Sequence, residues 1–162
     1  MKILVADDSD IPELTRVEIE SKIHSIPECI EAFEIDPNSR ASRWRTYFDG
    51  QSPQTSKPQR VVFKAIYQDS IVGYLAGHLT TRYNMDAEIQ SFYVLKMHQR
   101  NGIGSYLLSE FAGWVIANEC KSLCVGIAAN NKYQAFYLKH GGKHLNEHWI
   151  YWNDVRPLIY PA

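Results

Sequence analysis

The feature that most constrains this sequence is a glycine turn at residues 99–104, which contains Gly102 and Gly104. The segment before it, 87–95, is apolar, aromatic and β-prone, so it predicts a buried strand. The segment after it repeats apolar side chains at helical spacing, which predicts an amphipathic helix: Ile103, Leu107, Phe111, Trp114 and Val115. We therefore expect a strand, a turn that needs glycine, and a helix.

Such a turn is suited to binding an anion. Gly102 and Gly104 have no Cβ, so an anionic group can approach the backbone closely. The first N–H groups of the helix lack intrahelical partners, and the helix dipole adds partial positive charge there, so a phosphate or pyrophosphate fits. The turn has neither the Gly-Lys-Ser/Thr of NTPase loops nor the third glycine of the dinucleotide fingerprint. A glycine pair also occurs in turns that need it for geometry alone.

The composition limits the classes of function. A chain of 162 residues is expected to form a single domain, residues 1–162. The formal net charge of −1 gives no electrostatic case for a nucleic acid or a membrane surface as partner. No apolar run is long enough to span a bilayer, and the acidic N-terminal segment is unlike a signal peptide. The three cysteines form no metal-ligand pattern, which favours a reducing cytoplasm and predicts no metal site.

The order of predicted elements indicates a mixed α/β fold in which a meander of strands is followed by alternating strands and helices. Asp10 is expected to cap the first helix, with Glu13 completing a capping box. Strands are expected at about 2–5, 60–67, 71–81, 87–95, 123–128 and 148–152, and helices at about 10–24, 27–48 with a break near 36–38, 103–119 and 131–139.

Two parts of the sequence resemble the motifs of the GNAT acetyltransferase superfamily. The glycine turn at 99–104, after a strand ending at residues 92–94, is similar to motif A of that family. Residues 130–131 and 135–142 are similar to its later motif, in which an Asn precedes a helix that carries Phe-Tyr and ends at glycine. Both motifs occur in the family's order and spacing. The resemblance implies an α/β (α+β) fold with a mostly antiparallel sheet of six to seven strands and about four helices.

The resemblance also implies an acetyl-CoA site. In the family fold, the strand at 87–95 and the strand at 123–128 diverge, and the pantetheine arm lies between them. Many members have Lys or Arg where this chain has Asn101, so the number of cations at the pyrophosphate is left open. One of two adjacent asparagines is expected to contact the arm, with Asn131 favoured. The implied cofactor residues are Phe92, Tyr93, Val94, Gln99, Arg100, Asn101, Gly102, Ile103, Gly104, Ser105, Asn130 and Asn131.

Acetyl transfer to an amine needs a base and an acid. An amine with a pKa near 10 is mostly protonated at neutral pH, so a base assists its attack. Glu88 is the candidate base, because a charge within an apolar strand needs an explanation and many GNAT members have a Glu there. The alternative is a paired structural carboxylate, with Arg82 as a partner.

Tyr137 is the candidate acid. A phenol has a pKa near 10, so it stays protonated at neutral pH and can donate to a departing thiolate. Tyr137 matches the tyrosine of the family's Phe-Tyr pair, and the alternative is a ring that serves packing with Phe136. Three histidines are interpreted as structural: His78, His144 and His148. For His78, which lies on a predicted strand, the alternative is a position that faces the acceptor pocket.

The acceptor amine is open at the level of sequence. Glutamates on the first helices favour a cationic amine, but Arg40, Arg43 and Arg45 soon reverse that charge. We expect a small-molecule amine or a protein amino group as acceptor, and the sequence leaves a homodimer open. Two other hypotheses remain: a non-catalytic acyl-CoA-binding sensor of the same fold, and an unrelated phosphate-binding α/β domain.

Overall fold

The computed structural model describes residues 1–25, 31–54, 56–128 and 132–160. Within them a seven-stranded mixed sheet has the order β1-β2-β3-β4-β5-β7-β6. The expected sheet of six to seven strands is confirmed, and all neighbouring strands are antiparallel except β4 and β5. The strands are β1 Lys2–Val5, β2 Ser56–Tyr67, β3 Ser70–Thr80, β4 Ala87–Val94, β5 Leu123–Gly126, β6 Lys143–Asn146 and β7 Trp149–Trp152.

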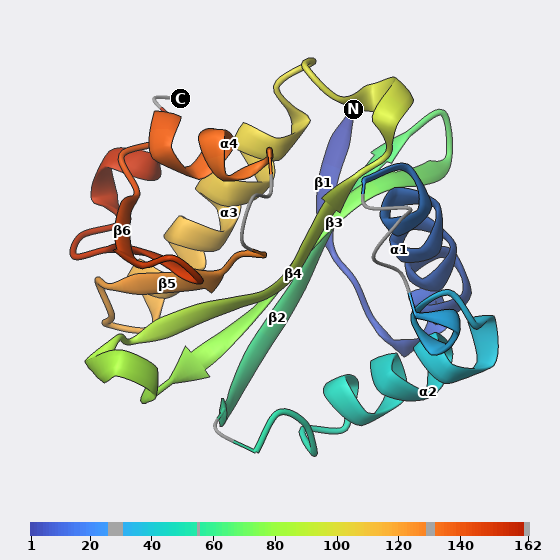
Figure 1. Ribbon diagram of the computed structural model, residues 1–162, viewed down its shortest axis with the longest axis horizontal. Helices are drawn as coiled ribbons and strands as arrows, with labels where there is room; N and C mark the ends of the chain where they lie inside the picture. Colours follow the sequence, from blue (N-terminus) through green and yellow to red (C-terminus); the bar gives the residue numbers. More distant parts are fainter. Residues whose placement is uncertain (26–30, 55, 129–131, 161–162) are drawn as a thin grey trace.

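Four α-helices in the described ranges cover the sheet: α1 Ile11–Ser25, α2 Pro37–Phe48, α3 Ile103–Ala117 and α4 Gln134–Lys139. The helices α1 and α2 lie on one face, and α3 and α4 lie on the other (Figure 1). None of the helices in the described part of the chain is long and apolar enough to cross a lipid bilayer.

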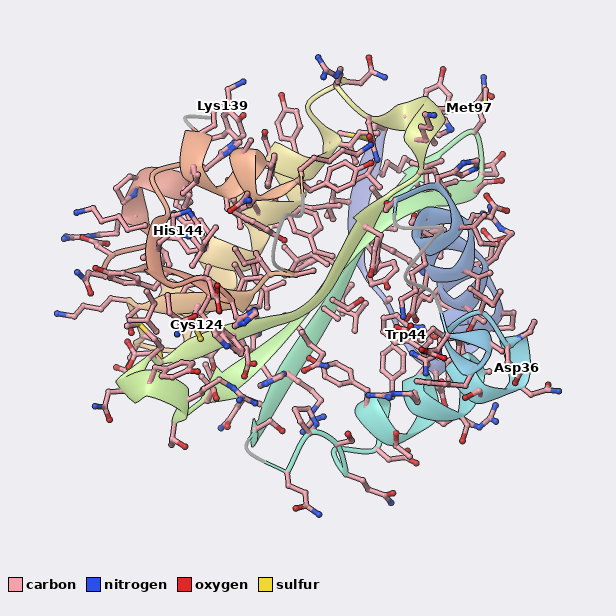
Figure 2. The ribbon with its side chains drawn as sticks, in the orientation of Figure 1. Asp36, Trp44, Met97, Cys124, Lys139 and His144 are labelled. Carbon is pink, nitrogen blue, oxygen red and sulfur yellow. The ribbon has the colours of Figure 1, made fainter. Side chains whose placement is uncertain are left out.

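Each face of the sheet has its own apolar core. On the α3 face, Leu107, Leu108 and Phe111 are fully buried against side chains of the sheet. On the other face, α1 and α2 pack on the sheet through Leu14, Val17 and Trp44, which lies between α2 and the strands (Figure 2). Burial of side chains on both faces explains why β3 is apolar almost throughout and does not alternate.

The helix starts agree only partly with the sequence expectations. Asp36 caps α2 by accepting a hydrogen bond from Ser39 N at 2.7 Å, and Pro37 occupies the first turn, as expected at the break near 36–38. At the first helix the capping box is formed by Asp7 and Asp10 around a 3₁₀ turn, so the expected box of Asp10 and Glu13 was wrong. Glu13 instead accepts a hydrogen bond from Ile71 N and fixes α1 on the sheet.

The pairing between β4 and β5 determines where the site lies. These two strands are parallel and are paired only from Ala87 to Ile89, so the rest of β4 is unpaired on that side within the described residues. At the closed end, Asp86 Oδ2 accepts hydrogen bonds from Lys121 N and Ser122 N, both at 3.0 Å. The expected divergence of the two strands is therefore present.

β6 was not expected from the sequence. Its residues Lys143–Asn146 are all exposed, and it pairs with β7 at the far edge of the sheet. A short polar edge strand has no apolar alternation, so its pairing depends on the neighbouring strand and not on its own composition.

Candidate active site

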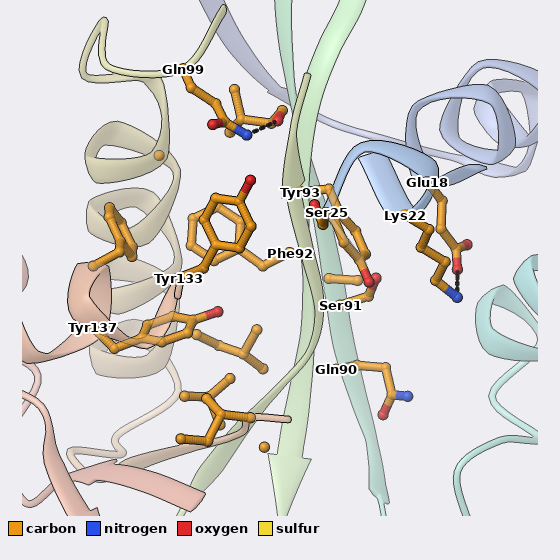
Figure 3. A pocket seen from close by; sticks show the side chains of 18 of the residues that line it. Glu18, Lys22, Ser25, Gln90, Ser91, Phe92, Tyr93, Gln99, Tyr133 and Tyr137 are labelled. Atoms are coloured by element: carbon orange, nitrogen blue, oxygen red, sulfur yellow. Dashed lines mark hydrogen bonds and ion pairs between the residues drawn. The ribbon is translucent and has the colours of Figure 1, made fainter. Parts of the chain in front are cut away.

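A pocket of about 1360 Å³ lies where β4 and β5 diverge and continues around β4. Figure 3 shows the two sides of β4. Phe92, Tyr133 and Tyr137 lie on one side, together with α3 and α4; we call this the α3/α4 side. The α1/α2 side is formed by residues of α1, of α2 and of the 3₁₀ turn Ala32–Glu34, together with Tyr93. The size is above the usual range for a single small-molecule site, which suits two ligands.

The glycine turn opens onto the α3/α4 side. Gly102 has φ +80°, a left-handed conformation that favours glycine, and it is the N-cap of α3 with no side-chain hydrogen bond capping the helix among the described residues. Gln99 Nε2 donates to Val94 O at 2.9 Å and thus ties the turn to the end of β4 (Figure 3). The first N–H groups of α3 are therefore available at the pocket.

Most of the predicted cofactor residues line this pocket: Phe92, Tyr93, Val94, Gln99, Arg100, Gly102, Gly104 and Ser105. Ile103 instead faces the apolar core and is 5% exposed, because the first turn of α3 has one side on the sheet. Asn101 is exposed and donates to His98 O at 3.4 Å, and it is not part of the pocket wall. Asn130 and Asn131 lie outside the described residues.

The charges on the two sides of the pocket differ. The α3/α4 side has four basic residues on its described wall, Lys96, Arg100, Lys132 and Lys139. Among the described lining residues, the two acidic ones, Glu18 and Glu34, both belong to the α1/α2 side. A site for several phosphate charges requires this kind of unopposed positive charge.

Tyr137 projects into the α3/α4 side of the pocket from the short helix α4 (Figure 3). Its ring contacts Phe92, Phe136 and Trp152, with centroid distances of 6.3, 5.5 and 6.0 Å. Burial raises the pKa of Tyr137, so the phenol is neutral and protonated at physiological pH. The contacts fix the ring, and the hydroxyl can donate a proton.

Glu88 does not reach the pocket wall. Its side chain is only 5% exposed, and its carboxylate contacts Arg82 Nε at 3.1 Å and His78 Nε2 at 3.3 Å. Burial works against the charged form, but the hydrogen bonds from His78 and Arg82 and the positive charge of Arg82 outweigh it and hold the pKa of Glu88 below its usual range. Glu88 is thus an anion at neutral pH and a weak direct base.

His78 connects Glu88 to the pocket. It lies directly opposite Glu88 in the β3–β4 register, is 0% exposed, and has Nδ1 at 3.1 Å from the hydroxyl of Tyr47. With the proton on Nε2, His78 donates to Glu88 and accepts from Tyr47, so one tautomer satisfies all three groups. Tyr47 lines the pocket on the α1/α2 side.

The chain Tyr47–His78–Glu88 was not predicted from the sequence. His78 was interpreted there as structural, with a position facing the acceptor pocket as the alternative, and Tyr47 was not singled out. A polar residue inside the apolar strand β3 was the available signal for His78, whereas nothing local connects Tyr47 on α2 to it.

The sequence of residues 23–142 matches the sequence model of the Acetyltransferase (GNAT) family. The chain belongs to the GNAT acetyltransferase family. The resemblance found in the two sequence motifs is therefore confirmed. No curated protein matches the GNAT chain closely enough to count as a relative.

Solved structures agree with the GNAT fold. PaiA N-acetyltransferase from Thermoplasma acidophilum, solved in complex with coenzyme A, has a TM-score of 0.74 at 18% identity, over 93% of this chain and 98% of that chain. An acetyltransferase from Thermus thermophilus has a TM-score of 0.75 at 20% identity, over 94% and 97%. Ribosomal-protein-alanine N-acetyltransferase from Brucella melitensis has a TM-score of 0.66 at 20% identity, over 93% and 95%. At these identities the likeness concerns the fold.

The α1/α2 side of this GNAT pocket contains a compact set of charges. Glu18 on α1 accepts from Lys22 Nζ at 3.0 Å (Figure 3) and lies 3.6 Å from Arg40 Nη1 on α2. Arg40 and Trp44 are each only 5% exposed, although both line the pocket. The sequence indicated charges of both signs here but not that they meet.

Proposed function

We propose that the chain is an acetyl-CoA-dependent N-acetyltransferase that acts on a primary amine by direct attack of the amine on the thioester. The observation that carries this proposal is a single pocket along the unpaired part of β4. It joins the glycine turn, Tyr137 and the wall formed by Tyr47. A cofactor and an amine entering from opposite sides of β4 meet beside Tyr137.

The residues present fit the cofactor. The first turn of α3 and the four basic residues of the α3/α4 side suit a pyrophosphate. The unpaired edge of β4 beyond Ile89 offers backbone groups to an extended arm. The fold neighbour from Thermoplasma acidophilum was solved with coenzyme A, which supports an acyl-CoA here. Acetyl-CoA supplies an activated acetyl group as a thioester.

Tyr137 is proposed as the general acid. Its phenol is protonated at neutral pH and has no hydrogen-bond partner within the described residues. It can therefore donate its proton to the departing sulfur when the carbon–sulfur bond breaks. A neutral donor does this without adding a positive charge beside the incoming amine.

Glu88 is proposed to act as a base through His78 and Tyr47. The amine passes a proton to the oxygen of Tyr47, and Tyr47 passes its own proton to His78 Nδ1 over the 3.1 Å contact. The imidazolium that forms is stabilised by the Glu88 carboxylate at 3.3 Å. The low pKa of Glu88 suits this supporting role better than direct proton abstraction.

Thiol release from acetyl-CoA across a panel of small amines and peptides with free amino groups tests this function. Release that requires an amine supports the proposal. Calorimetry on the same protein measures binding of coenzyme A independently. Tight binding without release for any acceptor would indicate the sensor alternative, and stronger binding of free nucleotides than of coenzyme A would indicate an unrelated phosphate-binding protein.

A further inference from the structure

The α1/α2 side of the pocket has an excess of basic groups. Among its described residues, Lys22, Arg40 and Arg43 line it, against Glu18 and Glu34. The charge balance of this side alone is therefore positive, in contrast to the cationic acceptor that the glutamates of the first helices favour. The proposed acceptor enters the pocket from this side.

The two carboxylates on this side are already engaged. Glu18 is bound by Lys22 at 3.0 Å, lies 3.6 Å from Arg40, and has a side chain only 10% exposed. Glu34 accepts a hydrogen bond from Glu31 N at 3.0 Å and lies 3.9 Å from Lys22. Both carboxylates are therefore already paired with cations, which weakens their attraction for the ammonium group of a polyamine.

Several donors on this side, in contrast, lack an acceptor among the described residues. Arg40 Nε, Arg40 Nη2 and Trp44 Nε1 are buried and have no hydrogen-bond partner in that part of the chain. Arg40 and Trp44 are one turn apart on α2, so both side chains lie on the same face of that helix. Buried donors without an acceptor are unfavourable, and in native proteins they call for an explanation. An acceptor oxygen supplied by a ligand would satisfy them.

We propose that Arg40 and Trp44 form a subsite for an anionic group, a carboxylate or a phosphate, carried by the acceptor amine. This inference rests on the proposed acetyl transfer. The guanidinium offers a planar pair of donors that matches either anion, and the indole N–H adds a third donor nearby. Because these atoms are covered by protein, the guanidinium turns toward the pocket as the anion enters, a side-chain change that is common on binding.

The experiment compares acceptors that differ only in the anionic group. The pairs are L-phenylalanine with phenethylamine, L-ornithine with putrescine, and phosphoethanolamine with ethanolamine. The measured quantity is the ratio of kcat/KM within each pair, from thiol release at constant pH. We expect the member with the anion to be preferred, and the phosphate pair distinguishes a phosphate from a carboxylate site. Preference for the member without the anion in all three pairs would overturn the subsite.

A carboxylate also lowers the pKa of a nearby amine, which by itself changes the ratio of kcat/KM within a pair. Variants of the subsite therefore separate this effect from binding of the anion. Trp44→Phe removes one donor and keeps an aromatic ring, and Arg40→Gln removes the charged fork. We expect the ratio to fall about threefold to tenfold in the first and about tenfold to 10²-fold in the second, as for hydrogen bonds to a charged group. Arg45→Gln, at an exposed position of α2 outside the pocket, is the matched control and should keep the ratio. An unchanged ratio in both Trp44→Phe and Arg40→Gln contradicts the inference.

Failure of the proposed function can be distinguished from failure of the subsite. If no amine of any pair releases thiol, acetyl transfer fails as the function. Calorimetry with phosphoethanolamine and β-alanine on the protein loaded with coenzyme A then decides on the subsite. Binding that is lost in Arg40→Gln and kept in Arg45→Gln supports it, and absence of binding to the wild-type protein overturns it. Near-ultraviolet circular dichroism checks that each variant is folded.

Discussion

The two sides of the pocket differ in how the chain builds them. The α3/α4 side comes from two continuous segments: the end of β4, the glycine turn and the start of α3 follow one another within residues 92–105, and residues 132–140 supply the rest. The α1/α2 side is assembled from α1, α2 and the middle of the sheet, through contacts such as Tyr47 with His78, 31 positions apart. The α3/α4 side can therefore be recognised in part as a sequence motif, whereas the α1/α2 side arises only from packing.

The largest expected effect comes from breaking the contact between His78 on β3 and Glu88 on β4. We expect Glu88→Gln to lower turnover about 10²- to 10³-fold at neutral pH, because it removes the anion that stabilises a protonated His78. The loss should shrink as pH rises and the amine deprotonates by itself. Thiol release measured against pH, with a saturating amine of high pKa, checks both the size and the trend.

Tyr47→Phe gives the matched control for that prediction, because it breaks the same link at the pocket end and leaves Glu88 with its partners. If the three groups act as a unit, the double variant should lose little more than either single variant. Additive losses would mean that Glu88 and Tyr47 act separately. Normal turnover in Tyr47→Phe would leave Glu88 as a structural carboxylate.

A smaller effect is expected on the α3/α4 side. We predict that Tyr137→Phe lowers turnover about 10- to 10²-fold, because water can partly replace the phenol as proton donor. The ring contacts with Phe92, Phe136 and Trp152 remain, so binding of acetyl-CoA should be unchanged by calorimetry. If the variant binds acetyl-CoA poorly, the hydroxyl of Tyr137 contributes to binding of the cofactor before reaction.

The difference in charge between the two sides of the pocket can be tested by removing one arginine from each side. Arg100→Gln on the α3/α4 side should weaken coenzyme A binding about threefold to tenfold, with less weakening at high salt, because an exposed charge is screened. Arg43→Gln removes the same charge from the α1/α2 side and should leave the affinity for coenzyme A unchanged. Equal losses in both variants, measured by calorimetry at two salt concentrations, would contradict the division of the pocket.

The smallest effect concerns the closed end at which β4 and β5 are still paired, beside Asp86. Hydrogen bonds from Lys121 N and Ser122 N to Asp86 lower its pKa, so its contribution to stability is complete above the pKa of an unfolded aspartate and is lost as pH falls through the folded value. We expect Asp86→Ala to cost about 2 kcal/mol in the free energy of unfolding at pH 7, and the deficit to shrink below about pH 4.

Urea unfolding at both pH values measures this change. Glu110→Ala, at an exposed position of α3, serves as control and should stay within about 0.5 kcal/mol of the wild type. A deficit for Asp86→Ala that is independent of pH would mean that the aspartate acts through packing and not through its charge.

The parts of the fold that were predictable are those whose signal is local. The apolar run of β4 and the helical spacing of α3 specify their own conformation, and the family resemblance supplied the mostly antiparallel character of the sheet and the approximate number of its strands. β6 lacked such a signal because its residues are exposed and only one of them, Leu145, has a large apolar side chain. The first capping box was misplaced because Asp7 and Asp10 satisfy the same spacing rule as Asp10 and Glu13.

For the candidate site, the sequence indicated which residues are unusual but not where their side chains lie. Glu88 stood out as a charge in an apolar strand, but its separation from the pocket depends on the β3–β4 register that places His78 beside it. Arg40 looked like one of several helix arginines, and its burial results from the packing of α2 on α1. Ile103 was included with its neighbours in the turn, although helical geometry directs it to the core.

The unpaired stretch of β4 has a consequence for association between molecules. A free sheet edge commonly recruits strands from other chains, and proteins protect such edges by covering them. Here the unpaired stretch lines the pocket, and the rings of Phe92 and Phe136, whose centroids are 5.6 Å apart, lie beside it. A strand of another chain would have to enter the pocket to pair with this stretch, so we expect it to pair with a narrow extended molecule instead.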